Sequence, residues 1–167
     1  MDLSALARRV AQHTILLFII YGVFTSPDQL KGDIDATEYK YMCGATQIEN
    51  GNLTGQTQEE YINDTMRVLL TASVIENRKN SKVWKGSTTE EVVLAKEGKY
   101  WQYASVTRNG FKTTEASDRV KLCVKYVLLY GPICPENVVY QGQGKNGSGI
   151  YKSIPVRGDK DELFCYE

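Results

Sequence analysis

Residues 57–78 decide the fold, because the stretch TQEEYINDTMRVLLTASVIENR carries the signals of a long helix from start to finish. It opens on Thr57 with Glu60 three residues later, which is the capping box that satisfies the free N–H groups of a helix start. Apolar and small side chains then recur at the spacing of one helix face, at Ile62, Met66, Leu69, Leu70 and Ser73. The sequence therefore predicts an amphipathic helix that buries this stripe and ends near residue 78.

Shorter helices are predicted on both sides of this stretch. Asp35 is positioned to cap a helix over about residues 37–48. A second capping box opens a short helix over about residues 87–95. Ser117 opens the last predicted helix, which ends at the Gly-Pro pair of residues 131–132 because proline cannot continue a helix.

The sequence pattern changes after the last predicted helix, from helical spacing to short apolar runs. These runs predict strands at residues 137–141, 150–156 and 163–166. The Gly-rich and Asn-containing segment 143–149 is predicted to be the turn between the first two strands. Helices that precede a small antiparallel sheet indicate the α+β class.

Composition and charge exclude several classes of function. The chain has 167 residues, with 20 Lys and Arg against 20 Asp and Glu, so it lacks the basic excess of a nucleic-acid-binding protein. The only histidine is His13, inside an apolar N-terminal run. Ser-His and Cys-His catalysis and nearly every catalytic zinc site need histidine, so any acid–base chemistry here must rest on carboxylates. The sequence shows no cofactor fingerprint and no metal-binding motif, so we expect no cofactor and no metal.

The first 30 residues form a membrane-seeking segment. Arg8 and Arg9 precede a strongly apolar run at residues 15–24, the pattern of an export signal or a membrane anchor. A bilayer needs about 20 apolar residues, and we expect membrane contact through residues 10–27. No clean cleavage site follows, which favours an uncleaved or releasable signal-anchor. The alternative is an amphiphilic helix that packs on a partner protein.

The chain has four cysteines, none of them in a Cys-x-x-Cys pair. This spacing is unlike that of a structural zinc site. An even number of cysteines allows two disulfides in an oxidising compartment, and it equally allows four buried thiols that behave as small apolar side chains. Both states stay open at this point for the four residues, Cys43, Cys123, Cys134 and Cys165.

Several segments, taken in order, resemble the SleB-type cell wall hydrolases. The end of the long stretch, LLTASVIENR, is similar to the Ala-x-Val-Ile-x-Asn-Arg stretch of that family, and Thr-Thr-Glu-Glu-Val-Val follows it as it does there. The resemblance covers about residues 40–167. Its further segments are residues 101–105, residues 135–141 with 147–149, and residues 164–166.

The resemblance implies a lysozyme-like catalytic domain at residues 31–167 that cleaves peptidoglycan glycan strands as a lytic transglycosylase. Relatives of this kind occur in spore-cortex lysis and in bacteriophages. The catalytic glutamate of the family opens a motif between two helices, and Glu49 in Glu-Asn-Gly-Asn is the best local match. An ungapped alignment selects Glu59, with Glu60 beside it. Both lie in the first turn of a capped helix, where acidic residues are favoured by the helix dipole alone, so Glu49 is the better candidate.

Four further side chains are candidates for contact with sugar: Gln102, Tyr103, Tyr140 and Gln141. Amides pair with hydroxyl and acetamido groups, and tyrosine rings can stack on a sugar face. Each could instead serve the protein's own backbone. Asn77 and Arg78 are expected either to brace the cleft or to cap the long helix. No second carboxylate downstream has an obvious role. This leaves a hydrolysing muramidase and a non-catalytic wall-binding or virion structural protein as alternatives.

Overall fold

The predicted long helix is present as α3 (Gln58–Arg78), and its first residues form the predicted capping box. The Thr57 hydroxyl accepts the Glu60 N–H at 3.2 Å, while the Glu60 carboxylate accepts the Thr57 N–H at 3.1 Å. This computed structural model describes residues 3–51, 53–97, 100–103 and 115–167.

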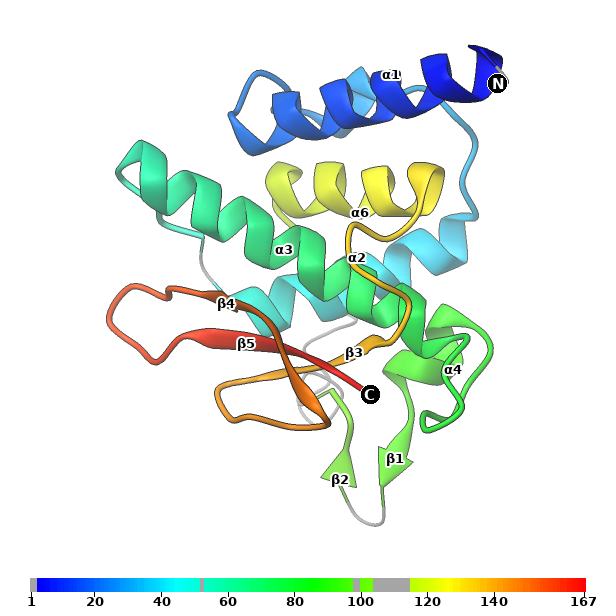
Figure 1. Ribbon diagram of the computed structural model, residues 1–167, viewed down its shortest axis with the longest axis vertical. Coiled ribbons are helices and arrows are strands. Elements are labelled where there is room, and N and C mark those ends of the chain that lie inside the picture. The colour runs from blue at the N-terminus through cyan, green and yellow to red at the C-terminus, as the bar shows by residue number, and fades with distance from the viewer. Residues whose placement is uncertain (1–2, 52, 98–99, 104–114) are drawn as a thin grey trace.

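The described residues form an α+β fold, as predicted, with a helical layer and a three-stranded antiparallel sheet (Figure 1). The helices other than α3 are α1 (Leu3–Ile20), the 3-10 helix η1 (Pro27–Gln29), α2 (Ala36–Asn50), α4 (Thr89–Val93) and α6 (Asp118–Tyr130). The strands are β1 (Lys96–Glu97), β2 (Tyr100–Trp101), β3 (Val138–Gly142), β4 (Gly149–Ile154) and β5 (Glu162–Tyr166). The small β1–β2 pair was not predicted from the sequence.

Local capping places the shorter helices close to their predicted positions. The Asp35 carboxylate accepts the Glu38 N–H at 2.7 Å at the start of α2, and the Ser117 hydroxyl caps α6. The capping box of α4 is displaced by one residue from its predicted position, because Thr88 and Glu91 form it. That helix ends at Val93, two residues earlier than predicted.

Helix α3 separates two apolar cores, so its buried surface is wider than the predicted stripe. One face contributes Val68, Leu69, Ala72 and Ile75 to a core shared with α2, α4 and α6. The other face meets the sheet, through Leu70 and Val74 of α3 and Val138, Ile154 and Phe164 of the strands. Packing on both sides buries nearly all of the second half of α3.

The order of the strands differs from the simplest interpretation of the sequence. The turn at residues 143–149 leads from β3 to β4, but these two strands do not pair with one another. Strand β5 lies between them and pairs antiparallel with both. Its central place agrees with the burial of both Phe164 and Cys165, which point to opposite faces of the sheet.

The N-terminal helix α1 is long and apolar enough to cross a membrane, judged by length and composition. In the folded chain it contacts α3 and α6. Its C-terminal half contributes Ile19 to the helical core. The helix therefore packs on its own chain through one face, whereas the sequence had offered an anchor or a contact with a partner protein.

All four cysteines are free thiols in this structure. Cys43, Cys123 and Cys165 are buried and Cys134 is half-buried. Burial raises the pKa of the Cys43 thiol to about 12 and that of Cys134 to about 11. Of the two states that the sequence left open, two disulfides or four thiols, the structure shows the four thiols.

Candidate functional site

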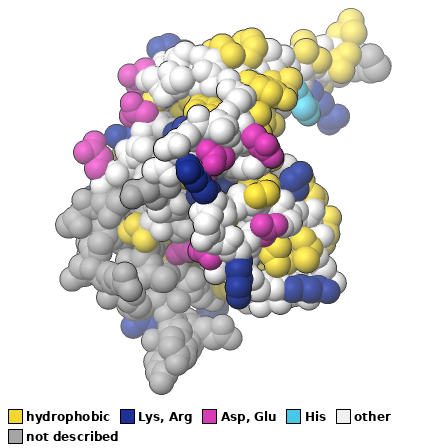
Figure 2. All heavy atoms as spheres, turned by 90° about the vertical axis from the view of Figure 1, so that its left-hand side faces the viewer, with side chains coloured by type: hydrophobic (Ala, Val, Ile, Leu, Met, Phe, Trp, Pro, Cys, Tyr) yellow, Lys and Arg dark blue, Asp and Glu magenta, His cyan; other side chains and the backbone are white. Residues whose placement is uncertain are grey.

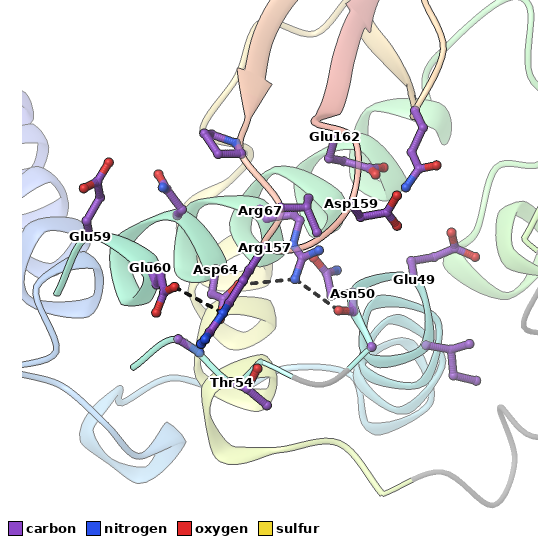
Figure 3. A pocket seen from close by; sticks show the side chains of 17 residues that line it. Glu49, Asn50, Thr54, Glu59, Glu60, Asp64, Arg67, Arg157, Asp159 and Glu162 are labelled. Atoms are coloured by element: carbon purple, nitrogen blue, oxygen red, sulfur yellow. Dashed lines mark hydrogen bonds and ion pairs between the residues drawn. The ribbon is translucent and has the colours of Figure 1, made fainter. Parts of the chain in front are cut away.

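A cleft of about 530 Å³ opens where the helical layer meets the sheet. One wall is the end of α2 together with Gly51, Thr54 and Gly55, and the floor is the first half of α3 (Figure 3). The connection from β4 to β5 and the first residue of β5, Glu162, form the opposite wall, and Gln143 after β3 adds to the lining. The cleft is therefore built from segments that lie far apart in the sequence.

Glu49 lines this cleft from the last turn of α2. Gly51, at φ 60°, ends the helix directly after it, and the Gln47 amide donates to the Gly51 carbonyl at 2.7 Å. Asn50 fixes the helix end to its neighbour, because its amide donates to the Thr71 hydroxyl of α3 at 3.1 Å. The Glu49 side chain is half-buried, and its Oε1 is buried completely.

The first turn of α3 supplies the two alternative glutamates, and the structure gives them different surroundings. Glu60 serves as the capping residue, and backbone hydrogen bonds from Gln56 and Thr57 hold its pKa below the usual range. Glu59 is exposed and lies at the far end of the cleft from Glu49 (Figure 3). A glutamate held in its ionised form by capping bonds is a poor proton donor.

Two arginines line the cleft, and both are engaged in ion pairs. Arg67 is a buried residue of α3 that donates to the Asn50 carbonyl at 3.2 Å and pairs with Asp64 at 3.3 Å. Arg157 pairs with Glu60 at 3.6 Å (Figure 3). Six carboxylates share the lining with these two arginines, so the cleft is acidic. The six are Glu49, Glu59, Glu60, Asp64, Asp159 and Glu162.

Sequence reasoning missed two carboxylates of this cleft, Asp159 and Glu162. Asp159 comes from the β4–β5 connection and Glu162 begins β5, and both lie across the cleft from Glu49 (Figure 3). Burial raises the pKa of Glu162, Arg67 opposes that effect, and the charge of Asp159 adds to it. The only signal in the sequence was the acidic, turn-rich character of residues 157–162, which gives no distance to Glu49.

The four predicted sugar-contacting residues do not line the cleft. Tyr103 is only 1% exposed, because its ring packs against the Arg78 guanidinium at 4.9 Å, so it presents no face to a sugar in this conformation. Tyr140 packs edge-on against Trp84 at 5.5 Å, and Arg78 stacks on the same indole at 3.8 Å. Trp84 and Tyr103 thus both pack on the Arg78 guanidinium, and Tyr140 packs on Trp84.

One of these aromatic residues, Tyr103, also senses the charge of Glu49. Burial raises the pKa of Tyr103 to about 12, Arg78 opposes this shift, and the charge of Glu49 adds to it. Tyr103 thus lies within electrostatic range of both groups. The side-chain oxygens Oε1 of Gln102 and Gln141 are buried and accept no hydrogen bond in the described part of the chain.

Asn77 and Arg78 connect α3 to the sheet. The Asn77 amide donates to the carbonyls of Pro135 at 2.8 Å and Val138 at 3.0 Å. The Arg78 Nε donates to the Val139 carbonyl at 2.7 Å. The sequence had allowed these residues to brace the cleft or to cap the helix. In the structure neither side chain lines the cleft, and both instead hold α3 to β3 and the segment before it.

Within the described ranges, no cluster of three or more His, Cys, Asp or Glu side chains is arranged to hold a metal ion. Comparisons of the chain with protein-family models, with curated proteins and with solved structures give no match. The resemblance to SleB-type hydrolases therefore stays a prediction from sequence segments. The functional argument rests on the geometry of the cleft.

Proposed function

We propose that the cleft cleaves the glycan strand of peptidoglycan as a lytic transglycosylase, with Glu49 as its catalytic residue. The observation that carries the proposal is the place of Glu49, half-buried in the lining of a 530 Å³ cleft. A glycosidic bond breaks when its oxygen is protonated as the sugar ring becomes oxocarbenium-like. The donor must be a carboxyl group that still holds its proton, and burial of a carboxyl oxygen favours that form.

Glu49 would act twice in this mechanism. It first gives its proton to the glycosidic oxygen, and the C–O bond to the leaving sugar breaks. The resulting carboxylate then takes the proton of the substrate's own 6-hydroxyl, whose oxygen attacks the anomeric carbon and closes an anhydro ring. No water is consumed, and Glu49 ends the cycle protonated as it began.

The acidic lining supports the same chemistry through charge. An oxocarbenium-like transition state carries positive charge, and fixed negative groups around it lower its energy. Asp159 and Glu162 lie on the wall across from Glu49, where a bound sugar would lie between them. A glycan is a neutral, elongated ligand, and it suits a cleft lined by both carboxylates and amides.

The decisive experiment digests purified sacculi with the wild type and with Glu49→Gln. The exchange removes the proton donor and keeps the size of the side chain, so muropeptide release should fall at least about a thousandfold while the circular dichroism spectrum is unchanged. Glu59→Gln is the matched control, since it removes a carboxylate of the same cleft far from Glu49. Wild-type release by Glu49→Gln would refute the assignment, and loss in Glu59→Gln alone would move the role to that residue.

The second candidate function is a hydrolysing muramidase of the same cleft. The presence of Asp159 and Glu162 favours it, because inverting and retaining glycosidases both use a second carboxylate. Product masses separate the two, since an anhydro end lacks one water relative to a hydrolysed end. Sacculus binding with no turnover by the wild type would instead support the third function considered, a non-catalytic wall-binding or virion structural protein.

We also propose that the protein acts at the cell envelope, exported and attached to the membrane through its N-terminus, in a bacterial or bacteriophage context. The apolar helix α1 supports the attachment by its length and composition. Such an arrangement would hold the domain of residues 31–167 close to the wall. Fractionation of expressing cells tests the attachment independently of any enzymatic assay.

A further inference from the structure

Exposed apolar side chains concentrate on the N-terminal helix. Of the nine large hydrophobic residues that are exposed in the described part of the chain, seven lie between residues 3 and 23. Four of them, Leu3, Leu6, Val10 and Leu17, recur at helical spacing and share one face of α1. We call these four side chains the α1 stripe. Figure 2 shows the hydrophobic atoms continuing out to the protruding N-terminal end.

The opposite face of α1 is committed to the protein. Ile19 is 1% exposed, and Ile15, Leu16 and Ile20 pack against the same helical core. The Tyr126 hydroxyl of α6 donates to the Gln12 carbonyl at 3.3 Å. A bilayer-spanning α1 would have to leave this core and expose it to water, which costs about 25 cal/mol for each Å² of apolar surface uncovered.

The charges around the stripe have one sign. Residues 3–27 contain Arg8 and Arg9 and no acidic residue. Both arginines are exposed; at 3.6 residues per turn Arg9 lies about a quarter turn from the stripe, and Arg8 lies on the side of the helix away from it. An apolar helix face with a basic residue at its border and no acidic residue on the helix matches the surface of a membrane that contains anionic lipids.

The size of the stripe argues against a second protein chain as its occupant. A standard protein–protein interface takes about 20–30 residues from each partner. Seven exposed apolar residues on one helix and the turn after it supply far fewer. A lipid surface has no such requirement, because each side chain that enters the acyl region contributes separately.

We propose that α1 binds an anionic lipid bilayer in the plane of its surface. The α1 stripe enters the membrane while the opposite face stays packed on α3 and α6. This inference rests on the proposed membrane attachment and specifies its form, and it is independent of glycan cleavage. It replaces a spanning anchor by a peripheral one that the folded domain carries on its own surface.

The test uses the full chain and two kinds of vesicle, phosphatidylcholine alone and phosphatidylcholine mixed with phosphatidylglycerol. We expect flotation only with the anionic vesicles, and release by high salt and by alkaline carbonate. The double variant Arg8→Gln, Arg9→Gln should bind about thirtyfold more weakly, from the usual contribution of an arginine near such a surface.

Val10→Asp and Ala11→Asp form a matched pair, since both add one negative charge at adjacent exposed positions, and only Val10 belongs to the α1 stripe. Val10→Asp should lose binding well beyond the loss in Ala11→Asp. Equal losses would overturn the inference. Attachment that resists carbonate would show a spanning helix, so membrane attachment would stand and the in-plane form would fall. If the chain binds neither kind of vesicle, both the membrane attachment and its in-plane form are refuted. A dimer that Val10→Asp disrupts, in a chain that binds no lipid, would show that a second copy covers the α1 stripe.

Discussion

Replacement of Asn77 by alanine tests how the sheet is held above the helical layer. The Asn77 side chain is 4% exposed, and its amide donates to two carbonyls of the segment that leads into β3. Alanine removes the donor to both carbonyls, and that of Val138 is buried. The affected contacts hold the sheet to α3 beside the Arg78–Val139 hydrogen bond and the apolar packing.

The magnitude follows from the partners that remain. The Pro135 carbonyl also accepts the Val138 N–H at 3.0 Å, so it keeps one hydrogen bond in the variant. Loss of its second bond, from Asn77, costs about 1 kcal/mol. The Val138 carbonyl loses a buried donor, which costs about 1–3 kcal/mol. The free energy of unfolding should therefore fall by about 2–4 kcal/mol, equivalent to a Tm about 5–15 °C lower for a chain of this size.

Urea unfolding followed by circular dichroism measures this loss. Asn80→Ala is the matched control, because the same residue type is exposed three positions later in the sequence. Asn77→Asp should lose at least as much stability as the alanine variant, since it places carboxylate oxygens against two carbonyl oxygens. An Asn77→Ala protein within about 0.5 kcal/mol of Asn80→Ala would refute the role of Asn77 in holding the sheet to α3.

Three further results are expected from local contacts. Burial raises the pKa of Glu38, but the hydrogen bonds from Lys79 and Thr89 and the charge of Lys79 together outweigh it, so the folded pKa lies below its ordinary value. The charged carboxylate therefore adds stability above that ordinary value, and this stability is lost as pH falls through the folded pKa. Urea midpoints of the wild type should fall more between about pH 6 and pH 3 than those of Glu38→Gln. Gly147 has a φ of +64°, and a Cβ added there would lie 1.9 Å from the Tyr166 carbonyl oxygen, so Gly147→Ala should lower the free energy of unfolding by more than about 2 kcal/mol. Gly144→Ala adds a Cβ in open space, so thermal unfolding should show a change within about 0.5 kcal/mol. The Cys43 thiol is buried and has a pKa of about 12, so it should react with a thiol reagent only after urea is added. Peptide mass spectrometry measures this. Reaction of the folded protein as fast as that of an exposed thiol would contradict the burial of Cys43.

The sequence predicted the helices well because their ends depend on neighbours within four residues. Thr57, Asp35 and Ser117 each cap a helix through a backbone N–H three residues on, and such contacts are visible in a linear sequence. The strand order was not visible in the same way. Pairing of β5 with both β3 and β4 depends on packing against α3, which joins residues about ninety positions apart.

The candidate site shows the same difference between local and long-range signals. Glu49 was selected because the resemblance expects a glutamate between two helices, whose ends are local signals, and the structure places it in the lining of the cleft. Asp159 and Glu162 were missed because only the folded β4–β5 connection brings them across from Glu49. Tyr103 was assigned to a sugar groove because the sequence does not show what an aromatic side chain will contact. In the structure its ring packs against Arg78.

The central position of β5 has a consequence for how the chain folds. Strands β3 and β4 have no pairing with each other, so their edges stay open until β5 joins them. Until then the sheet-facing side of α3 also lacks the Phe164 side chain that covers it. A chain in which β5 has not docked exposes both strand edges and apolar surface, which makes this stage of folding the one most open to aggregation.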